Sequence, residues 1–148
     1  MSSRLPDTTA RAAPPNIGVL LRDPFLALTE HIHRRLCEHG HPEVRPAHGV
    51  VFQFLDDGGT RVSVLAARAQ VTKQSMAELV AHLEAHGYVE RVPDPTDRRA
   101  KLVRATARGR ETIPIALGAI AEMEERWRAR VGEDGMRRLR ELLDSIGA

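Results

Sequence analysis

The sequence predicts a single, mainly α-helical domain with one β-hairpin, and two short helices in a helix-turn-helix arrangement before that hairpin. Apolar residues recur at steps of three or four along most of the 148-residue chain, which is the spacing of amphipathic helices. Residues 88–104 break this spacing and read as two short strands around a Pro-Asp-Pro-Thr-Asp turn. Only Gln70-Val71-Thr72 separates the two short helices, which is typical of a helix-turn-helix unit.

The composition excludes several classes of protein. Apolar residues make up 42% and charged residues 28% of the chain, as in ordinary globular domains. No stretch approaches the ~18 consecutive apolar residues of a membrane span, and the N-terminus lacks the apolar segment of a secretory signal. The single cysteine cannot form an intrachain disulfide, so we expect a cytoplasmic protein. Because the common catalytic and nucleotide-binding motifs are absent, we expect neither an enzyme nor a cofactor.

The N-terminal region predicts a leader followed by one long helix. Residues 1–15 are rich in Ser, Thr, Ala and Pro, and we expect them to be a disordered leader. Asn16 is expected to cap a helix that ends at Gly40. Its apolar stripe passes unbroken through Pro24, which predicts one helix kinked there or two helices nearly in line.

The next three helices are predicted from their first residues. Pro46 is a good first-turn residue, and a helix from there ends at Asp56-Asp57-Gly58-Gly59. Ser63 is expected to cap a short helix over 64–69. Thr72 is expected to cap the following helix, 73–86, whose inner face carries Met76, Leu79, Val80 and Leu83.

The C-terminal half predicts a hairpin and then two helices. The strands are expected at 88–92 and 100–104. Thr106 is expected to cap a long helix with a kink at Pro114, and Gly132 to separate that helix from a final one.

Basic residues are concentrated beside the predicted helix-turn-helix. Six basic residues and no acidic one lie between Arg98 and Arg110. Such a run can reach a phosphate backbone while a neighbouring helix lies in the major groove. The alternative is a solvated sheet edge whose charges prevent aggregation.

The outer face of helix 73–86 carries polar side chains suited to reading DNA: Lys73, Gln74, Ser75, Glu78 and His82. Gln can bond adenine edges and Lys can reach guanine or phosphate, whereas Glu would repel phosphate. The alternative is an ordinary polar helix face.

The stretch from Val71 to Arg110 resembles the winged helix-turn-helix core of MarR-type transcriptional regulators. The resemblance rests on the capped helix, the Leu-Glu-x-x-Gly-Tyr-Val step at 83–89, the Asp-Pro-x-Asp-Arg-Arg wing at 94–99, and Thr106 with Gly109. Two positions depart from the family pattern: Ala105 replaces the usual Leu, and Glu78 lies where many members carry Arg or another polar residue.

The resemblance implies a mainly α fold with a winged helix-turn-helix core and a two-stranded wing, flanked by N- and C-terminal dimerisation helices. Residues 16–148 would form this one domain, with the DNA-binding core at 46–105 and the dimerisation helices at 16–44 and 107–148. The implied function is a homodimeric transcriptional repressor or activator on a pseudo-palindromic operator, with a repressor released by a small molecule as the favoured interpretation. The alternative is a winged-helix protein-interaction module without specific DNA binding, which Glu78 keeps open.

The resemblance and the outward faces together name a set of candidate DNA contacts. By the resemblance, Arg99 would enter the minor groove and Asp97 would orient it or a neighbouring arginine. The full set is Ser63, Thr72, Lys73, Gln74, Ser75, Glu78, Asp97, Arg98, Arg99 and Lys101.

The apolar stripes of the terminal helices predict a subunit interface, because a small core cannot cover both. The alternative is that the two helices pack on each other within a monomer. The candidate interface residues are Leu21, Phe25, Leu28, Ile113, Leu117, Ile120 and Trp127.

His48 and Phe52 could line a cavity for a small aromatic or phenolic effector, of the kind the family places between its two lobes. The alternative for each is structural packing.

The sequence does not favour a metal site or a redox-active cysteine. Five histidines lie between residues 31 and 48, but His31 and His33 point to different helix faces and we expect no metal site. Cys37 lies late in its helix, where the helix C-terminus disfavours a thiolate, so redox sensing is the less favoured interpretation. Bound zinc would revive a metal-dependent or redox enzyme.

Overall fold

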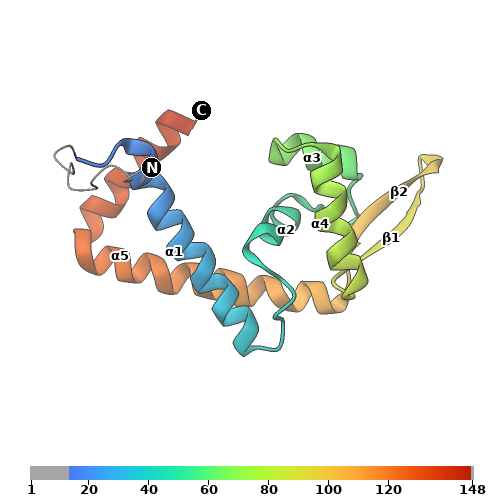
Figure 1. Cartoon of the computed structure of the whole chain (residues 1–148), viewed down its shortest axis with the longest axis horizontal. Coiled ribbons are helices and arrows are strands. Elements are labelled where there is room, and N and C mark those ends of the chain that lie inside the picture. Colours follow the sequence, from blue (N-terminus) through green and yellow to red (C-terminus); the bar gives the residue numbers. More distant parts are fainter. Residues whose placement is uncertain (1–13, 148) are drawn as a thin grey trace, which may run out of the picture.

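The computed structural model describes residues 14–147, so the leader predicted for 1–15 lies outside the described residues except for its last two. Two lobes are joined by one long helix (Figure 1). The elements in chain order are α1 (Ile17–Glu38), the 3₁₀ helix η1 (Pro46–His48), α2 (Gly49–Phe54), α3 (Val62–Ala69), α4 (Lys73–Ala85), β1 (Val89–Asp94), β2 (Asp97–Ala105) and α5 (Ala107–Gly147).

One lobe holds α3, α4 and the β1–β2 hairpin, and in the other α1 crosses α5 (Figure 1). A continuous apolar core in the first lobe includes Leu65, Met76, Val80, Leu83 and Val103, each fully buried. Three of these five belong to the predicted inner face of α4, at the helical spacing that places them on one side, and its fourth member, Leu79, is half-buried against the core. The core fixes α4 against α3, and leaves the opposite side of α4 facing outward.

Three of the four predicted caps are confirmed. The side chain of Asn16 accepts a hydrogen bond from the Val19 N–H at 3.2 Å, and that of Thr72 accepts one from the Ser75 N–H at 3.0 Å. Thr106 Oγ1 accepts one from the Gly109 N–H at 3.1 Å. The Ser63 cap is wrong: α3 begins two residues earlier than predicted, at Val62, with Arg61 in extended backbone as its N-cap, so Ser63 lies in the first turn.

Neither internal proline ends its helix. α1 is one helix through Pro24, so the alternative of two helices there is wrong, and α5 also continues through Pro114. In α5 the backbone leaves helical dihedrals at Gly132, with φ 77°. Glycine adopts positive φ without the steric cost that a side chain imposes. The predicted separation of a final helix at Gly132 is therefore confirmed.

The hairpin is longer than its predicted strands. β1 and β2 pair antiparallel from Val89–Ala105 to Asp94–Asp97. The regular ladder reaches Pro93, which pairs with Lys101, and the register then shifts between Pro93 and Asp94, so that β2 has extra residues there. Proline, which lacks an N–H group, is tolerated on edge strands and at such irregularities. On its other side β2 pairs with Thr60, whose N–H donates to the Val103 carbonyl at 2.8 Å.

Candidate DNA-binding site

Helix α4 presents its first turn to solvent. The tight link before it turns at Gln70, whose backbone is left-handed with φ 55°. Thr72 Oγ1 also donates to Ser75 Oγ at 2.9 Å. Lys73 and Gln74 lie beside this capped turn, and both are exposed. The cap thus holds the start of α4 rigid while its polar side chains remain free to contact a partner.

Further along α4, Glu78 and His82 differ in their surroundings. Glu78 is exposed, as its position on the outer face predicts. His82 is half-buried: its Nε2 donates to the Glu43 carbonyl at 2.8 Å, and its ring stacks on His48. The expectation that His82 belongs to the outer face is wrong, because the chain before α2 folds against it.

The outer end of the hairpin carries three cations with no ion pair among residues 14–147: Arg98 and Arg99 near the tip, and Lys101, which pairs with Pro93 in the ladder. Asp97 contacts both this end of the hairpin and Arg61. Its Oδ1 accepts a hydrogen bond from the Arg99 backbone N–H at 3.0 Å, and its Oδ2 lies 3.7 Å from an Arg61 guanidinium nitrogen. Asp97 therefore shapes the backbone of the tip directly.

Arg61 and Asp94 tie the hairpin to the start of α3, a link that the sequence did not reveal. Two guanidinium nitrogens of Arg61 lie 2.6 and 2.7 Å from Asp94 Oδ2. Asp94 Oδ1 accepts bonds from the N–H and hydroxyl of Thr96. These Thr96 bonds, followed by the Arg61 bond, lower the pKa of the Asp94 carboxyl below its ordinary value. No local pattern could predict this pair, because its members are 33 positions apart.

The rest of the basic run is held within the protein. Arg104 Nε donates to Glu90 across the hairpin at 2.7 Å, and Arg110 donates to the Ala105 carbonyl at 2.8 Å. Arg108 donates to the Tyr88 hydroxyl at 3.0 Å and lies over the Tyr88 ring. Only the part of the run at the outer end of the hairpin is thus left free of such contacts within the described chain.

A large cavity of about 720 Å³ lies between α1, the η1–α2 segment and α5. Its lining is mostly apolar, with a few polar groups that include His33, Arg45 and Thr112. Phe52 belongs to the lining, as the sequence interpretation expects. His48 does not, because its buried ring stacks on His82, with centroids 4.3 Å apart and planes 10° from parallel.

His48 is held in its neutral form. Burial, followed by the nearby His82 and Arg45, lowers its pKa from an ordinary 6.5 to about 4. Its Nδ1 accepts a hydrogen bond from the Arg45 N–H at 2.9 Å. A neutral ring can stack on His82 without charge repulsion, so His48 supports the segment that borders the cavity.

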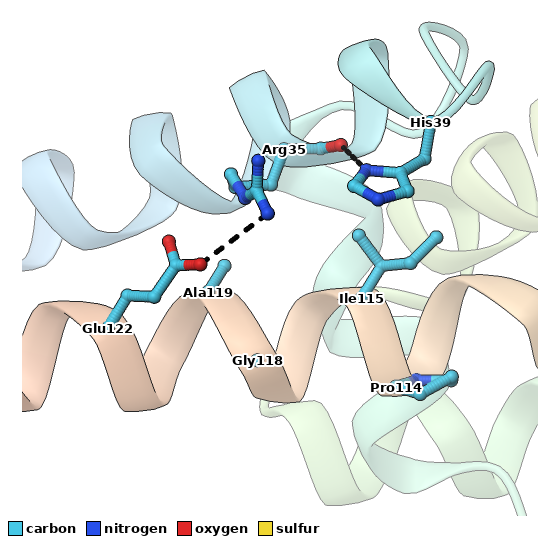
Figure 2. Close-up of a pocket in the computed structure, with 7 residues that line it drawn as sticks. All are labelled: Arg35, His39, Pro114, Ile115, Gly118, Ala119 and Glu122. Atoms are coloured by element: carbon cyan, nitrogen blue, oxygen red, sulfur yellow. Dashed lines mark hydrogen bonds and ion pairs between the residues drawn. The ribbon is translucent and has the colours of Figure 1, made fainter.

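A smaller cavity of about 290 Å³ lies between α1 and α5 (Figure 2). Its charged groups already have partners: an Arg35 guanidinium nitrogen lies 3.5 Å from Glu122 Oε1, and Glu122 Oε2 lies 2.7 Å from His31 Nε2. The bond from His31 is the first cause of the lowered pKa of Glu122. These pairs leave the small cavity without a free charge for a ligand.

The candidate interface residues lie on α1 and α5, and five of them also line the large cavity: Phe25, Leu28, Ile113, Leu117 and Ile120. Phe25 and Leu117 are 61% and 60% exposed, and Leu21 and Ile113 are also exposed. The other three are half-buried: Leu28, Ile120 and Trp127. The helix after Gly132 adds further exposed apolar side chains that the candidate set lacks: Leu139, Leu142, Leu143 and Ile146.

The described residues offer little support for a redox site, a metal site or a membrane-spanning helix. Cys37 is exposed, with Sγ 3.5 Å from His33 Nε2. In the part of the chain that the structure describes, no three His, Cys, Asp or Glu side chains are placed to hold a metal ion. No described helix combines the length and apolar character that crossing a membrane requires.

Comparison with known proteins identifies the family. Residues 44–100 match the model of the MarR family. The transcriptional regulator HosA of Escherichia coli O111:H- is 30% identical over 104 residues, which are 69% of this chain and 77% of HosA.

Solved structures agree. The crystal structure of MarR aligns with a TM-score of 0.74 and 25% identity over 90% of this chain and 96% of that one. The structure of a MarR-family regulator from Rhodococcus sp. RHA1 aligns with a TM-score of 0.69 and 26% sequence identity. The alignment covers 88% of this chain and 91% of that one. The predicted mainly helical fold with a two-stranded wing is confirmed, and its terminal helices contact each other. The chain belongs to the MarR family of winged helix-turn-helix, DNA-binding transcriptional regulators, which are not enzymes.

Proposed function

We propose that the protein binds a specific duplex as a homodimer, with α4 as the recognition helix in the major groove and the β1–β2 hairpin as a wing over the adjacent backbone. The observation that carries this proposal is the pairing of two exposed features on one lobe. One is the capped first turn of α4, with Lys73, Gln74 and Ser75. The other is the outer end of the wing, with three cations free of ion pairs within residues 14–147.

The two features suit different parts of a duplex. Gln74 can bond to an adenine edge through both its amide atoms, and Ser75 can reach a base or a phosphate. Arg98, Arg99 and Lys101 can neutralise phosphates or enter a narrow minor groove. Together they supply base contacts that specify a sequence and charge contacts that position the protein.

A second copy of the chain would cover the apolar faces of α1 and α5. Phe25 and Leu117 are more than half exposed, and further apolar side chains follow along the helix beyond Gly132. Contiguous apolar surfaces of this kind mark protein interfaces. A symmetric pair would present two recognition helices, which matches a pseudo-palindromic operator.

The large cavity supports release of the operator by a small molecule. Its volume of about 720 Å³ lies within the range of pockets that enclose ligands of drug size. An apolar lining that includes Phe52, with Arg45 among its few polar groups, suits a small aromatic acid or phenol. The protein would then act as a repressor that loses DNA affinity when the cavity fills.

The test is binding to a duplex selected by the protein from a random-sequence library. Gln74→Ala should relax the preference at one position of each half-site and lose about 1–3 kcal/mol of discrimination there. Arg137→Ala, an exposed arginine near the far end of α5, is the matched control and should leave the preference unchanged. Failure to select any sequence, with affinity independent of salt, would contradict DNA binding and favour the protein-interaction module that the exposed Glu78 permits.

A further inference from the structure

The segment from Glu43 to His48, here called the cavity segment, lies between the large cavity and the recognition helix. On one side, Val44, Arg45, Pro46 and Ala47 line the cavity. His33 of α1, which also lines it, donates from Nδ1 to the Val44 carbonyl at 2.9 Å. The segment is therefore both a wall of the cavity and bonded to a second wall.

On its other side, the cavity segment is bonded to α4. His82 Nε2 donates to the Glu43 carbonyl at 2.8 Å. The rings of His82 and His48 stack with centroids 4.3 Å apart. Because one side chain makes both contacts, His82 couples the position of α4 to the carbonyl of Glu43 and to the ring of His48.

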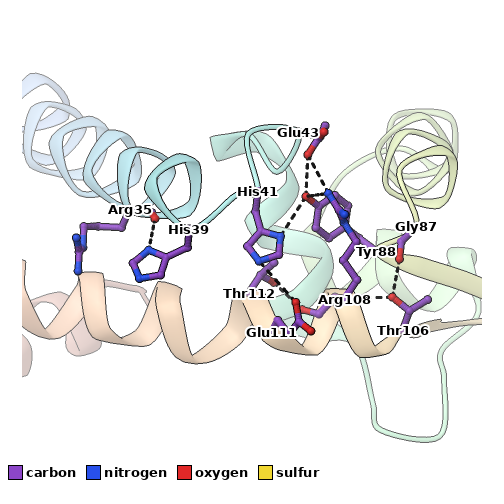
Figure 3. A network of polar contacts seen from close by, with 11 residues as sticks. Arg35, His39, His41, Glu43, Gly87, Tyr88, Thr106, Arg108, Glu111 and Thr112 are labelled. Carbon is purple, nitrogen blue, oxygen red and sulfur yellow. Dashed lines mark hydrogen bonds and ion pairs between the residues drawn. The ribbon is translucent and has the colours of Figure 1, made fainter.

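A third group of contacts reaches the start of the wing. The Tyr88 hydroxyl donates to Glu43 Oε2 at 2.8 Å, and Arg108 of α5 donates to that hydroxyl at 3.0 Å (Figure 3). His41 Nδ1 also lies 3.3 Å from the Tyr88 hydroxyl oxygen. Tyr88 immediately precedes β1, so Glu43 holds α4 through its carbonyl and the base of the wing through its carboxylate.

We propose that His82 is a positioning residue that transmits occupation of the cavity to the recognition helix through the Glu43–Val44 peptide. A molecule in the cavity presses on Val44 and Ala47. Because the Glu43 carbonyl and the Val44 carbonyl belong to adjacent peptides, a displacement there changes the bond to His82. Helix α4 then shifts relative to the wing. As a result, α4 and the wing can no longer contact the major groove of the DNA and the adjacent phosphate backbone at the same time. This proposal rests on the proposed function of the cavity.

The test uses 2-naphthoate, a fluorescent aromatic acid, as the probe, with the duplex selected by the wild-type protein. Saturating probe should lower the DNA affinity of the wild type by about tenfold, within the usual range of coupling between two sites. His82→Phe retains an aromatic ring but no N–H donor. Saturating probe should lower the DNA affinity of this variant by less than about twofold. Its affinity for the probe, and its affinity for DNA without the probe, should stay within about threefold of the wild-type values.

Two matched variants separate coupling from general damage. His82→Gln places an amide donor near the position of Nε2 and should restore most of the response. His39→Ala removes an exposed imidazole that bonds to the Arg35 carbonyl at the end of α1 and does not line the large cavity, and should respond like the wild type. A His82→Phe protein with the full response, or with DNA affinity reduced equally with and without probe, would overturn the proposal.

A second arm needs no ligand and separates this proposal from the proposed function. Ala116→Phe fills the cavity from α5, since Ala116 is one of its lining residues. It should speed amide hydrogen exchange over residues 80–85 in the wild-type background and add nothing in the His82→Phe background. An equal effect in both backgrounds, or none in either, would overturn the coupling. Failure of 2-naphthoate to bind the wild type would instead count against an aromatic effector.

Discussion

The wing tip offers the sharpest test of how this protein holds DNA, because Arg99 and Asp97 have separable roles. Arg99 is exposed and has no ion pair within residues 14–147, so its charge is available to a phosphate or a groove. Asp97 carries the opposite charge but accepts a hydrogen bond from the Arg99 N–H. Removing each in turn separates a charge effect from a shape effect.

For Arg99→Ala, the magnitude follows from counterion release. Each lost phosphate contact flattens the slope of log affinity against log salt by ~0.9. A dimer that loses two contacts should therefore have a slope that is flatter by ~1.8. The wild type therefore loses DNA affinity faster than the variant as salt rises. Between 50 and 200 mM salt, the ratio of wild-type to variant affinity should fall by roughly tenfold. Fluorescence anisotropy at four salt concentrations measures both slopes. A variant with an unchanged slope would show that Arg99 makes no phosphate or groove contact.

For Asp97, two substitutions give opposite expectations. Asp97→Ala removes the acceptor of the Arg99 N–H bond and also the carboxylate 3.7 Å from Arg61. The loss of one such hydrogen bond costs about 1 kcal/mol, so each wing should loosen and DNA binding should weaken. Asp97→Asn keeps the acceptor oxygen and removes the negative charge, so it should bind as tightly as the wild type or more tightly. Tighter binding by Asp97→Ala at fixed salt would refute the orienting role and leave a purely electrostatic wing.

Three other features of the structure give further predictions. The pKa of His48, about 4, lies below its value in the unfolded chain. The folded state thus binds fewer protons than the unfolded state, and stability present above pH 6.5 is lost as the pH falls towards 4. Urea unfolding should show that His48→Gln removes about 2 kcal/mol of the stability lost between pH 7 and 5, and an unchanged pH dependence would contradict this. A Cβ at Gly109 would lie 2.0 Å from the Tyr88 carbonyl oxygen, whereas one at Gly118 would meet nothing within 4 Å. Thermal or urea unfolding should therefore show Gly109→Ala to be destabilised by about 1–3 kcal/mol and Gly118→Ala to be neutral or more stable. Ile120→Asp places a charge in the proposed subunit interface and should yield monomers or unfolded chains in light scattering, and a wild-type protein that is itself a folded monomer would contradict the interface.

The elements that the sequence predicted well are those specified by nearby residues. The Thr72 cap depends on an N–H three residues away, and the inner face of α4 depends on spacing along one helix. Ser63 shows the limit of this reasoning. A serine before an apolar run resembles a cap, but the extended backbone falls at Arg61, whose side chain is fixed by Asp94 of the hairpin. The contact between Arg61 and Asp94 therefore lies at the start of α3, where the local preference of serine for caps predicted the wrong first residue.

The contacts around Glu43 could not be predicted for the same reason. His82 lies on the stripe that also carries Ser75 and Glu78, so helical spacing alone assigns it to the outer face. Its partner is a backbone carbonyl 39 positions earlier. Backbone carbonyls are present in every residue and carry no sequence signal. Only the packing of η1 against α4 makes this one available.

The apolar residues of α1 and α5 show why composition alone could not separate a cavity from an interface. Phe25, Ile113 and Leu117 line the large cavity, yet all three are exposed in the single chain. The cavity therefore opens onto the face where we propose that a second subunit binds. In such a dimer the partner would limit access to the cavity, and an occupant would fill space that the partner must otherwise cover. Linkage then requires that an occupant changes the affinity between subunits by the same factor as dimerisation changes the affinity for the occupant.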